Sequence, residues 1–330
     1  MPAVSIALDA KVSYLRGLCG QGDEAIETHF AWVFLVGDRA WKLRKPLARD
    51  TMDYRSLEAR RIGSLDEVRL NRRLAPRIYL EATPLVLEAD GTLAIGSRGA
   101  IVDWLVAMQR LDRARLLDAQ LPRETFIAAE LEPVTRLLAG FYAGVPPALV
   151  DGRAFVERLA RQVAANHAVL GGANRPGAPQ LRRQQLTFLA GHASLLEERA
   201  TSGCVVEGHG DLRPEHVFLG DPPAVIDCLE FDRDLRILDR AEELSFLQLE
   251  CARAGHARVG RDLARHCLAL LGDSAPDALL AFYRSHRAAT RAKLYVWRAA
   301  EPDGGMPSTW LERADGYIAG ALNDSALSLA

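Results

Sequence analysis

The sequence predicts an α+β protein of two lobes: a small N-terminal lobe over residues 1–108, with an antiparallel sheet and one long helix, and a larger, mostly helical lobe over residues 109–330. The length of 330 residues favours two domains, at about 150 residues each. Strand patterns of period two, punctuated by Gly-Asp and Asp-Gly turns, occupy the first third of the chain. Helical spacing dominates from about Asp112 onward.

The composition excludes several classes of protein. Forty-one basic and 43 acidic residues give a formal net charge of -2, so the chain offers no general basic surface for nucleic acid. Hydrophobic residues make up 49% of the chain, but no apolar run approaches the roughly 20 residues that cross a membrane. No export signal is recognisable, so we expect a cytoplasmic location. The five cysteines never form a CxxC pair, which argues against a disulfide framework or a zinc knuckle.

The first lobe is expected to begin with a helix over residues 5–18 and a β-hairpin over residues 26–45. β-rich residues flank a Gly-Asp turn in this hairpin. On its second strand the period of two places Ala40, Lys42 and Arg44 on one face and the large apolar residues on the other.

A long helix rich in Arg and Glu is expected next, over residues 57–74, because Ala75-Pro76 ends the pattern. Three strand-like stretches complete the lobe: TPLVLEA (83–89), TLAIG (92–96) and IVDWLVAMQRL (101–111).

The second lobe is read as helical, with helices expected over residues 125–142, 154–170, 184–200, 240–254, 259–271, 277–297 and 309–322. The stretch GGANRPGAP (171–179) indicates a loop between two of them. The exception is residues 203–230, where short apolar runs are punctuated by Gly and Pro.

Lysine is rare, since only four of the 41 basic residues are lysines: Lys11, Lys42, Lys45 and Lys293. A chain that otherwise uses arginine can retain lysine where a compact point charge on a flexible stem is required. Chance is an equally good explanation of the count by itself.

The exceptional stretch brings potential catalytic groups together. If residues 216–219 and 224–227 are strands joined by a four-residue turn, antiparallel pairing sets residue 219 against 224 and His216 against Asp227. The preceding loop HGDLRPE holds Asp211 near the same end. Two carboxylates and an imidazole suit a divalent cation and a polar nucleophile. The alternative is a plain turn at Gly210-Asp211 and a strand-end cap at Asp227.

The segment HGDLRPEHVFL (209–219), followed by VID (225–227), resembles the aminoglycoside phosphotransferase branch of the protein-kinase-like fold, whose loop usually reads HGDxxxxN and whose next strand ends in Asp. Three further segments of the chain are similar to an uncharacterised bacterial subgroup of phosphotransferase-like proteins. These segments are THFAWVFLVGDRAWKLRKP (28–46), DEVRLNRRLAP (66–76) and LEFDRDLRILD (229–239). Some members of that subgroup are joined to a P-loop kinase domain, and this chain contains no GxxxxGKS or GxxxxGKT element.

The resemblance implies a bilobal protein-kinase-like fold and a catalytic role for the 209–216 loop. Asp211 would orient or deprotonate the acceptor hydroxyl, with His209 and Arg213 of the same loop in the catalytic group. Asp227 would hold Mg²⁺ that bridges the phosphates of ATP. His216 takes the position of the family's metal-binding Asn. Because an imidazole is a softer ligand, the resemblance leaves three alternatives for this second metal position: it is altered, it is weakened, or it is better suited to Mn²⁺.

The resemblance also implies a nucleotide site in the first lobe. Lys42 would reach the α and β phosphates, with Ala40 beneath the adenine, and Glu67 is the best candidate to pair with Lys42, ahead of Glu58. Met108 and its neighbours 106–110 would form the hinge that offers backbone groups to adenine.

No GxGxxG motif covers the phosphates. The turn from Glu27 to Ala31 would take its place, with the Thr28 hydroxyl and backbone N–H groups capping the nucleotide. Thr28 and His29 are equally well explained as ordinary polar residues at a strand edge.

Two weaker groups carry open alternatives. The first comprises Glu230, Asp232, Arg236 and Asp239, which form either the acceptor side of the site or a salt-bridged loop. The second comprises Arg287, Arg291 and Lys293, which either receive an anionic acceptor or form a solvated basic face.

The function expected is ATP-dependent transfer of a phosphoryl group to a hydroxyl of a small molecule, without nucleic acid or membrane partners. The alternative is a nucleotide-binding pseudokinase that acts as a regulatory module, suggested by His216 in place of Asn. A zinc hydrolase built on His209, Asp211, His216 and Asp227 ranks last, because it leaves Lys42 and Glu67 unexplained.

Overall fold

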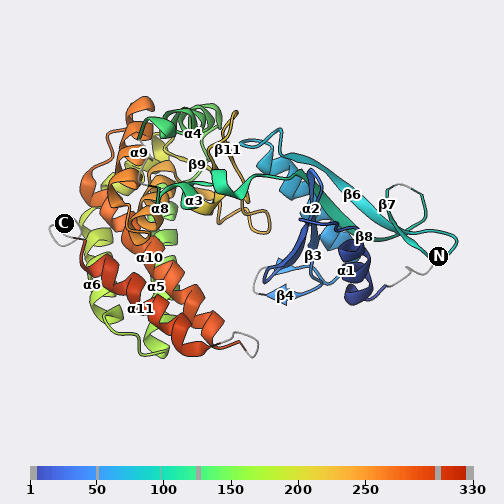
Figure 1. The fold of residues 1–330 in the computed structure, drawn as a ribbon. Helices are drawn as coiled ribbons and strands as arrows, with labels where there is room; N and C mark the ends of the chain where they lie inside the picture. Colours follow the sequence, from blue (N-terminus) through green and yellow to red (C-terminus); the bar gives the residue numbers. More distant parts are fainter. Residues whose placement is uncertain (1–5, 50–51, 97, 124–127, 302–305, 325–330) are drawn as a thin grey trace. The chain divides into compact units, whose positions relative to one another are not determined.

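Figure 1 shows the chain as a computed structural model, which describes residues 6–49, 52–96, 98–123, 128–301 and 306–324. The chain divides into two compact units, residues 1–123 with 215–235 and residues 124–214 with 236–330. The first unit holds a six-stranded antiparallel sheet and the second is mainly helical, so the predicted α+β class is confirmed. The lobe boundary at residue 108 stays a prediction.

The sheet of the first unit follows the order β1-β2-β3-β8-β6-β7, and every pairing is antiparallel. Its strands are β1 (Glu24–Glu27), β2 (Ala31–Val36), β3 (Arg39–Arg44), β6 (Tyr79–Leu87), β7 (Leu93–Ile95) and β8 (Ala100–Gln109). β2 and β3 form the predicted hairpin, and Gly37 in its turn has a φ of 58°, which glycine adopts without the steric cost of a Cβ. A separate two-residue hairpin pairs β4 (Ala48–Arg49) with β5 (Met52–Asp53).

Two helices cover the two faces of this sheet. α1 (Leu8–Gly17) packs Leu15 into the core cluster that contains Leu43 of β3. α2 (Leu57–Asn71) lies along β8 and β6, and its Val68 belongs to a second cluster on the opposite face. The face of β3 that carries Lys42 is therefore turned toward α2, as the period of two predicts.

Short elements continue the first unit: a 3₁₀ turn (Arg113–Arg115), α3 (Leu117–Gln120), a 3₁₀ turn (Pro214–His216) that begins in the second unit, β10 (Val217–Phe218) and β11 (Ala224–Val225). The β10–β11 hairpin is far from the N-terminus in sequence, yet Ala224 and Phe218 pack with Val106 of β8. This packing attaches the segment that carries Asp227 to the sheet.

The second unit is built of eight described α-helices around one small β pair. They are α4 (Glu132–Gly144), α5 (Gly152–Gly172), α6 (Ala178–Gly191), α7 (Ala193–Thr201), α8 (Arg240–Arg253), α9 (Ala257–Leu270), α10 (Asp277–Ala299) and α11 (Pro307–Leu322), with a 3₁₀ turn (Ala128–Leu131) before α4. β9 (Val205–Glu207) pairs antiparallel with β12 (Ile237–Asp239). α10 packs against α5, α8 and α11, so one long helix organises this unit.

One predicted helix is wrong in extent. Residues 184–200 fall into two helices, α6 and α7, because His192 between them has φ -125° and ψ 22°, outside the helical region. The ring of His192 stacks on Phe188 at 4.3 Å between centroids, and Gly191 before it lowers the cost of leaving the helix. The helix expected from residue 125 begins at Glu132, and its first three expected residues lie outside the described residues.

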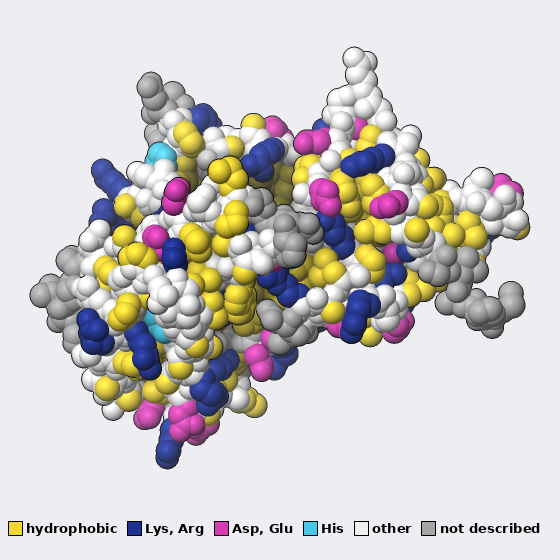
Figure 2. All heavy atoms as spheres, turned by 90° about the horizontal axis from the view of Figure 1, so that it is seen from below, with side chains coloured by type: hydrophobic (Ala, Val, Ile, Leu, Met, Phe, Trp, Pro, Cys, Tyr) yellow, Lys and Arg dark blue, Asp and Glu magenta, His cyan; other side chains and the backbone are white. Residues whose placement is uncertain are grey.

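The surface carries charged and apolar side chains side by side, as the mixed composition predicts. On the face drawn in Figure 2, basic, acidic and apolar side chains are interspersed, and no large area of one charge sign is visible. Among the described residues, no helix is both long and apolar enough to cross a membrane. All five cysteines are free thiols and four are buried, as expected from their spacing.

A buried ionic cluster fixes α1 to the sheet and to α2. Lys11 of α1 donates to Asp103 of β8 at 2.7 Å, and Arg60 of α2 donates to the other oxygen of the same carboxylate at 2.7 Å. All three side chains are almost fully buried. Removing one member of such a cluster leaves uncompensated charge in the interior.

We therefore expect Asp103→Asn to lower the free energy of unfolding by about 3 kcal/mol, because Lys11 and Arg60 would lose their shared counter-charge. Urea denaturation measures this change. Asp66→Asn is the matched control, since Asp66 pairs with Arg69 on the exposed side of α2 and should change stability by less than about 1 kcal/mol. Equal changes in the free energy of unfolding for the two substitutions would contradict the role of Asp103 as the shared counter-charge of Lys11 and Arg60.

Candidate active site

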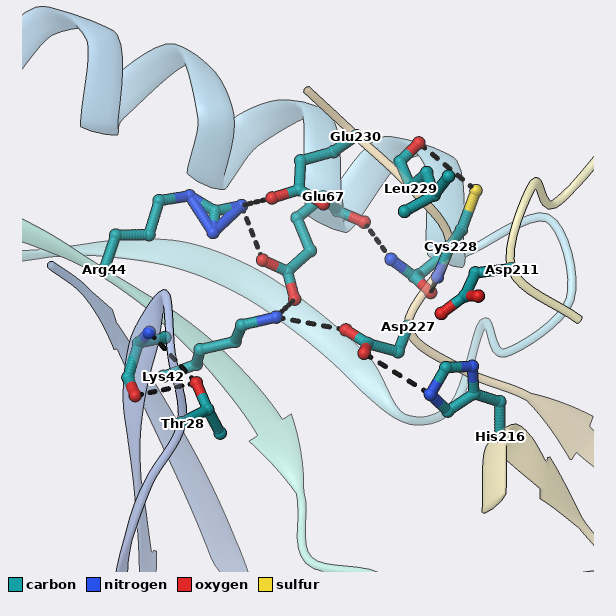
Figure 3. A network of polar contacts seen from close by, with 12 residues as sticks. Thr28, Lys42, Arg44, Glu67, Asp211, His216, Asp227, Cys228, Leu229 and Glu230 are labelled. Carbon is teal, nitrogen blue, oxygen red and sulfur yellow. Dashed lines mark hydrogen bonds and ion pairs between the residues drawn. The ribbon is translucent and has the colours of Figure 1, made fainter. Parts of the chain in front are cut away.

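Lys42 of β3 is the centre of a charged network in the first unit (Figure 3). Its Nζ donates to Glu67 Oε1 of α2 at 2.8 Å and to Asp227 Oδ1 at 3.1 Å. The side chain of Glu67 is fully buried, whereas that of Asp227 is 47% exposed. One amine thus joins a buried carboxylate on a helix to a solvent-accessible carboxylate that follows β11.

Arg44, two residues further along the same face of β3, holds Glu67 from the other side. Its Nη2 donates to Glu67 Oε2 at 2.5 Å and to the carbonyl of Gly63 at 2.8 Å, and it pairs with Glu230 at 2.9 Å. The hydroxyl of Tyr54 donates to Glu230 at 3.2 Å. Both oxygens of Glu67 are therefore occupied, which leaves its carboxylate one orientation.

Asn71, one turn after Glu67 on α2, connects the helix to the segment that follows Asp227. Its Nδ2 donates to the backbone carbonyl of Glu67 at 2.9 Å, and its Oδ1 accepts the N–H of Cys228 at 2.9 Å. The position of Asp227 is thus set by α2 as well as by β11.

The electrostatics of the network keep Lys42 charged. Burial alone would lower the pKa of Lys42, but the carboxylates of Asp227, Glu67 and Glu230 outweigh it and raise this pKa well above its ordinary value. Burial likewise raises the pKa of Glu230, against the opposing effect of Arg44. Lys42 is consequently a permanent cation at physiological pH.

The hairpin that carries His216 and Asp227 was predicted one residue out of register. Phe218, not residue 219, lies opposite Ala224, so the loop has five residues and not four. The N–H of Leu219 donates to the carbonyl of Arg115 at 2.8 Å, which takes Leu219 out of the hairpin pairing.

His216 and Asp227 nevertheless meet, by a different route from the one predicted. The backbone of His216 pairs with that of Ile226: the N–H of Ile226 donates to the carbonyl of His216 at 2.9 Å. Asp227 has a φ of 60°, in the left-handed region, and its N–H donates to the hydroxyl of Tyr79 at 3.1 Å. This turn leaves Asp227 Oδ2 at 3.5 Å from His216 Nε2.

The donor set around Asp227 fits a divalent cation that keeps most of its coordination for phosphate and water. No group of three or more His, Cys, Asp or Glu side chains arranged for a metal occurs among the described residues. Mg²⁺ in phosphoryl-transfer sites is commonly held by one or two carboxylates plus substrate oxygens. Asp227 can supply such a carboxylate, and the neighbouring imidazole of His216 can supply a nitrogen ligand.

The second unit holds the loop with Asp211, and a buried acid on α8 shapes it. Glu243 accepts the backbone N–H groups of His209, at 3.0 Å, and of Gly210, as well as the hydroxyl of Tyr142 at 2.8 Å. Burial raises the pKa of Glu243, while the two backbone N–H groups lower it in part. A Cβ on Gly208, just before the loop, would lie 2.5 Å from Glu243 Oε2, so a larger residue there would displace this carboxylate.

The three predicted catalytic residues differ in their surroundings. His209 is buried, and its Nδ1 accepts the N–H of Asp211 at 3.3 Å, so it shapes the loop from inside. Arg213 donates through Nε to Asp211 Oδ2 at 3.0 Å. The structure therefore places Asp211 and Arg213 together at the surface of the loop, with His209 beneath them.

The predicted nucleotide residues are only partly arranged as expected. Ala40 is buried on the face of β3 that carries Lys42, and Met108 lies opposite it on β8. The N–H groups of Gln109 and Arg110, inside the expected hinge, already donate to the carbonyls of Ile78 and Asp38. The adenine contacts of Ala40 and Met108 stay a prediction.

The Thr28 turn is closed on itself. The Thr28 hydroxyl donates to the carbonyl of Ala31 at 2.8 Å and accepts the Ala31 N–H at 3.0 Å. This geometry favours an ordinary polar residue at a strand edge. Glu58, the second candidate partner of Lys42, instead pairs with Arg61 on the surface of α2.

The acidic group around residues 230–239 does not form one set. Glu230 belongs to the Arg44 network, Arg236 pairs with Glu207 at 2.9 Å, and Asp239 is buried with Arg199 and Tyr283. These contacts favour the salt-bridged reading. Arg287 and Arg291 are also largely buried, so the solvated basic face considered for them is not found.

Sequence reasoning missed three residues that hold the site: Glu243, Asn71 and Tyr79. Glu243 is one of three acids in α8, and the sequence pattern gives it no mark that sets it apart from the other two. Asn71 and Tyr79 are buried polar residues. Their partners in the site, Cys228 and Asp227, lie more than 140 residues away in sequence. No local pattern indicates such partners.

Relatives by sequence have no established function. No family model matches the chain. Uncharacterized proteins of Mycobacterium tuberculosis and Mycobacterium bovis are 32% identical over 282 residues, which cover 83% of this chain and 55% of theirs. The chain spans about half the length of these curated relatives.

Solved phosphotransferase structures resemble the chain along most of its length. Aminoglycoside 2'-phosphotransferase-IIIa in its GDP complex has a TM-score of 0.52 at 17% identity, over 94% of this chain and 98% of that one. A choline kinase from Streptococcus pneumoniae has a TM-score of 0.52 at 11% identity, over 94% and 97% of the two chains. The structure therefore has the protein-kinase-like fold of aminoglycoside phosphotransferases and choline kinases, as the sequence motifs indicate.

Proposed function

We propose that the protein is a phosphotransferase that moves the γ-phosphoryl group of a nucleoside triphosphate, with ATP as the expected donor, to a hydroxyl of a small molecule. The observation that carries this proposal is the position of Lys42, whose amine lies within hydrogen-bonding distance of both Glu67 and Asp227. Phosphoryl transfer is catalysed mainly by positioned charges, because its transition state spreads negative charge over several oxygens.

The first unit supplies the groups for the nucleotide. Lys42 would contact the phosphates, and Glu67, itself held by Arg44, would keep the lysine in place. Asp227 and His216 would hold the divalent cation. When bound, that cation would supply positive charge to the phosphate oxygens. Asp227 is suited to this role because its carboxylate is accessible while its backbone is fixed by Tyr79 and β11.

The second unit supplies the group for the acceptor. Asp211 would orient the acceptor hydroxyl and take its proton, as the likeness of the HGDLRPEH segment to the phosphotransferase loop implies. Glu243 supports this role by fixing the backbone of the loop at His209 and Gly210. Arg213, which lies 2.9 Å from Asp211 Oδ2, would help to hold this carboxylate in one orientation.

The structural neighbours support a hydroxyl acceptor and leave the donor base open. They include a choline kinase and an aminoglycoside phosphotransferase described as a complex with GDP and kanamycin. Both ATP and GTP are therefore donors to compare.

Lys42→Met should lower kcat/KM for the nucleotide by about 100-fold, because it removes the cation that contacts the phosphates. Nucleotide-dependent release of ADP or GDP, measured with Mg²⁺ or Mn²⁺ and a panel of hydroxyl compounds, tests this change. Lys45→Met is the matched control, since Lys45 lies three residues further on and pairs with Glu27. Wild-type rates in the Lys42 variant would exclude the proposed site.

Asp211→Asn should reduce phosphoryl transfer by at least about 100-fold while leaving the thermal unfolding temperature and nucleotide binding near wild-type values. Asp262→Asn, which alters an exposed acid of α9, is the control and should transfer normally. Tight nucleotide binding without transfer in the wild-type protein, unaffected by Asp211→Asn, would favour the regulatory pseudokinase.

His216→Asn should shift the metal preference from Mn²⁺ toward Mg²⁺ by about tenfold, because it replaces an imidazole nitrogen with an amide oxygen beside Asp227. Rates at matched concentrations of the two metals, with wild type as the control, measure this ratio. An unchanged ratio would show that His216 does not contact the cation.

A further inference from the structure

Arg291 of α10 is a partly buried arginine, with 18% of its side chain exposed, and its guanidinium has few partners. Among the described residues its Nη2 donates to the hydroxyl of Tyr295 at 3.3 Å, its Nε is buried without an acceptor, and its nearest carboxylate oxygen, on Glu250, is 4.0 Å from Nε. Guanidinium carries five N–H donors, and buried donors in native proteins are nearly always satisfied. The buried Nε donor of this side chain therefore has no acceptor among the described residues.

Arg291 lies beside the loop that carries Asp211, within the same unit. Burial alone would lower the pKa of Arg291, but Tyr317, Asp211 and Glu250 outweigh it and raise the pKa above its ordinary value, which places the Asp211 carboxylate within electrostatic reach. One turn earlier on α10, Arg287 donates to the carbonyl of Gly210 at 3.3 Å. The contact of Arg287 with Gly210 gives the same placement independently.

The neighbouring carboxylates do not satisfy Arg291. Glu250 accepts the hydroxyl of Tyr317 with both oxygens, at 2.8 and 2.9 Å. Glu242 pairs with Arg287 at 2.8 Å and lies 3.5 Å from His286. The acids that face this part of α10 are thus already engaged.

Aromatic rings next to Arg291 are covered by further cations. Tyr295 stacks on Trp310 and on Tyr317, with 5.7 Å between centroids in each pair. The guanidinium of Arg253 lies 3.6 Å from the centroid of Tyr317, and that of Arg313 lies 5.0 Å from the centroid of Trp310. Ring faces that would otherwise attract a cationic ligand are therefore occupied by the protein's own arginines.

We propose that the phosphate acceptor carries an anionic group, a phosphate or a carboxylate, which Arg291 binds so that a hydroxyl of the same molecule reaches Asp211. This inference rests on the proposed function for the role of Asp211. An anion satisfies the open N–H groups of Arg291, whereas an ammonium group would be repelled by Arg291 and Arg287 in a poorly solvated site.

The experiment compares four probes that share a six-carbon polyol: glucose 6-phosphate, gluconate, glucose and glucosamine. Calorimetric titration of the full chain, with nucleotide and metal present, should show glucose 6-phosphate or gluconate binding at least about tenfold more tightly than glucosamine. The phosphate and carboxylate probes distinguish the two anionic groups.

Variants identify the residue responsible. Arg291→Gln should weaken binding of the anionic probe by at least about tenfold, and Arg291→Lys should retain part of it, because lysine keeps the charge. Arg265→Gln, which alters an exposed arginine of α9, is the control and should bind as wild type does. If the glutamine variant unfolds, binding of the anionic probe by the Arg291→Lys variant still tests the role of the charge at this position.

Several outcomes would overturn the inference: no binding of either anionic probe, equal binding of glucosamine, or no effect of Arg291→Gln. A further result would also overturn the inference: the Lys42→Met variant loses binding of the anionic probe while the Arg291→Gln variant keeps it. That result would assign the anion to the position of the nucleotide phosphates. Failure of the proposed function gives a different result, namely no binding or turnover of nucleotide, with the Arg291-dependent affinity for the anion still measurable.

Discussion

The first unit depends on one buried carboxylate, that of Glu67. It has no access to solvent, and its two oxygens accept from Lys42 and Arg44, both on the same face of β3. A buried carboxylate of this kind is tolerated only when its charge is compensated and its lone pairs are used. The requirement explains why α2 must lie against β3, why Lys42 stays charged, and why Glu230 is drawn to Arg44. The same lysine that compensates Glu67 also contacts Asp227 at 3.1 Å, so the two carboxylates share one cation.

The two units fix their functional carboxylates by different means. Asp227 is held by an ion pair with Lys42 and by two hydrogen bonds of the backbone. Tyr79 accepts the N–H of Asp227, and Asn71 accepts the N–H of Cys228. The loop of Asp211 is instead held by Glu243, which binds backbone N–H groups directly. In both arrangements the backbone beneath the carboxylate is fixed by hydrogen bonds, while part of the side chain stays exposed: 47% for Asp227 and 20% for Asp211.

Much of the fold could be predicted because its signals are local. The hairpin of β2 and β3 and the long helix α2 follow from alternation, turn residues and a terminating proline, whereas the order of the strands in the sheet was not predicted. The pairing of Lys42 with Glu67, which the family resemblance implied ahead of Glu58, is found in the structure. The break at His192 was missed although Gly191 stands just before it, because a single glycine inside a helical pattern is often tolerated.

The site was less predictable than the fold because its contacts join distant parts of the chain. The β10–β11 register depends on a hydrogen bond between Leu219 and Arg115, and Arg44 contacts Glu67 and Glu230, which lie on other elements. A period of two could place Arg44 on a face but could not name the acids opposite it.

The close approach of Gly208 to Glu243 has an evolutionary consequence. A methyl group at position 208 would lie 2.5 Å from the carboxylate oxygen of residue 243, so the acid would have to move away from it. Such a movement would weaken its hydrogen bonds to the backbone N–H groups of His209 and Gly210, so we expect the residues at 208 and 243 to change together in homologous sequences.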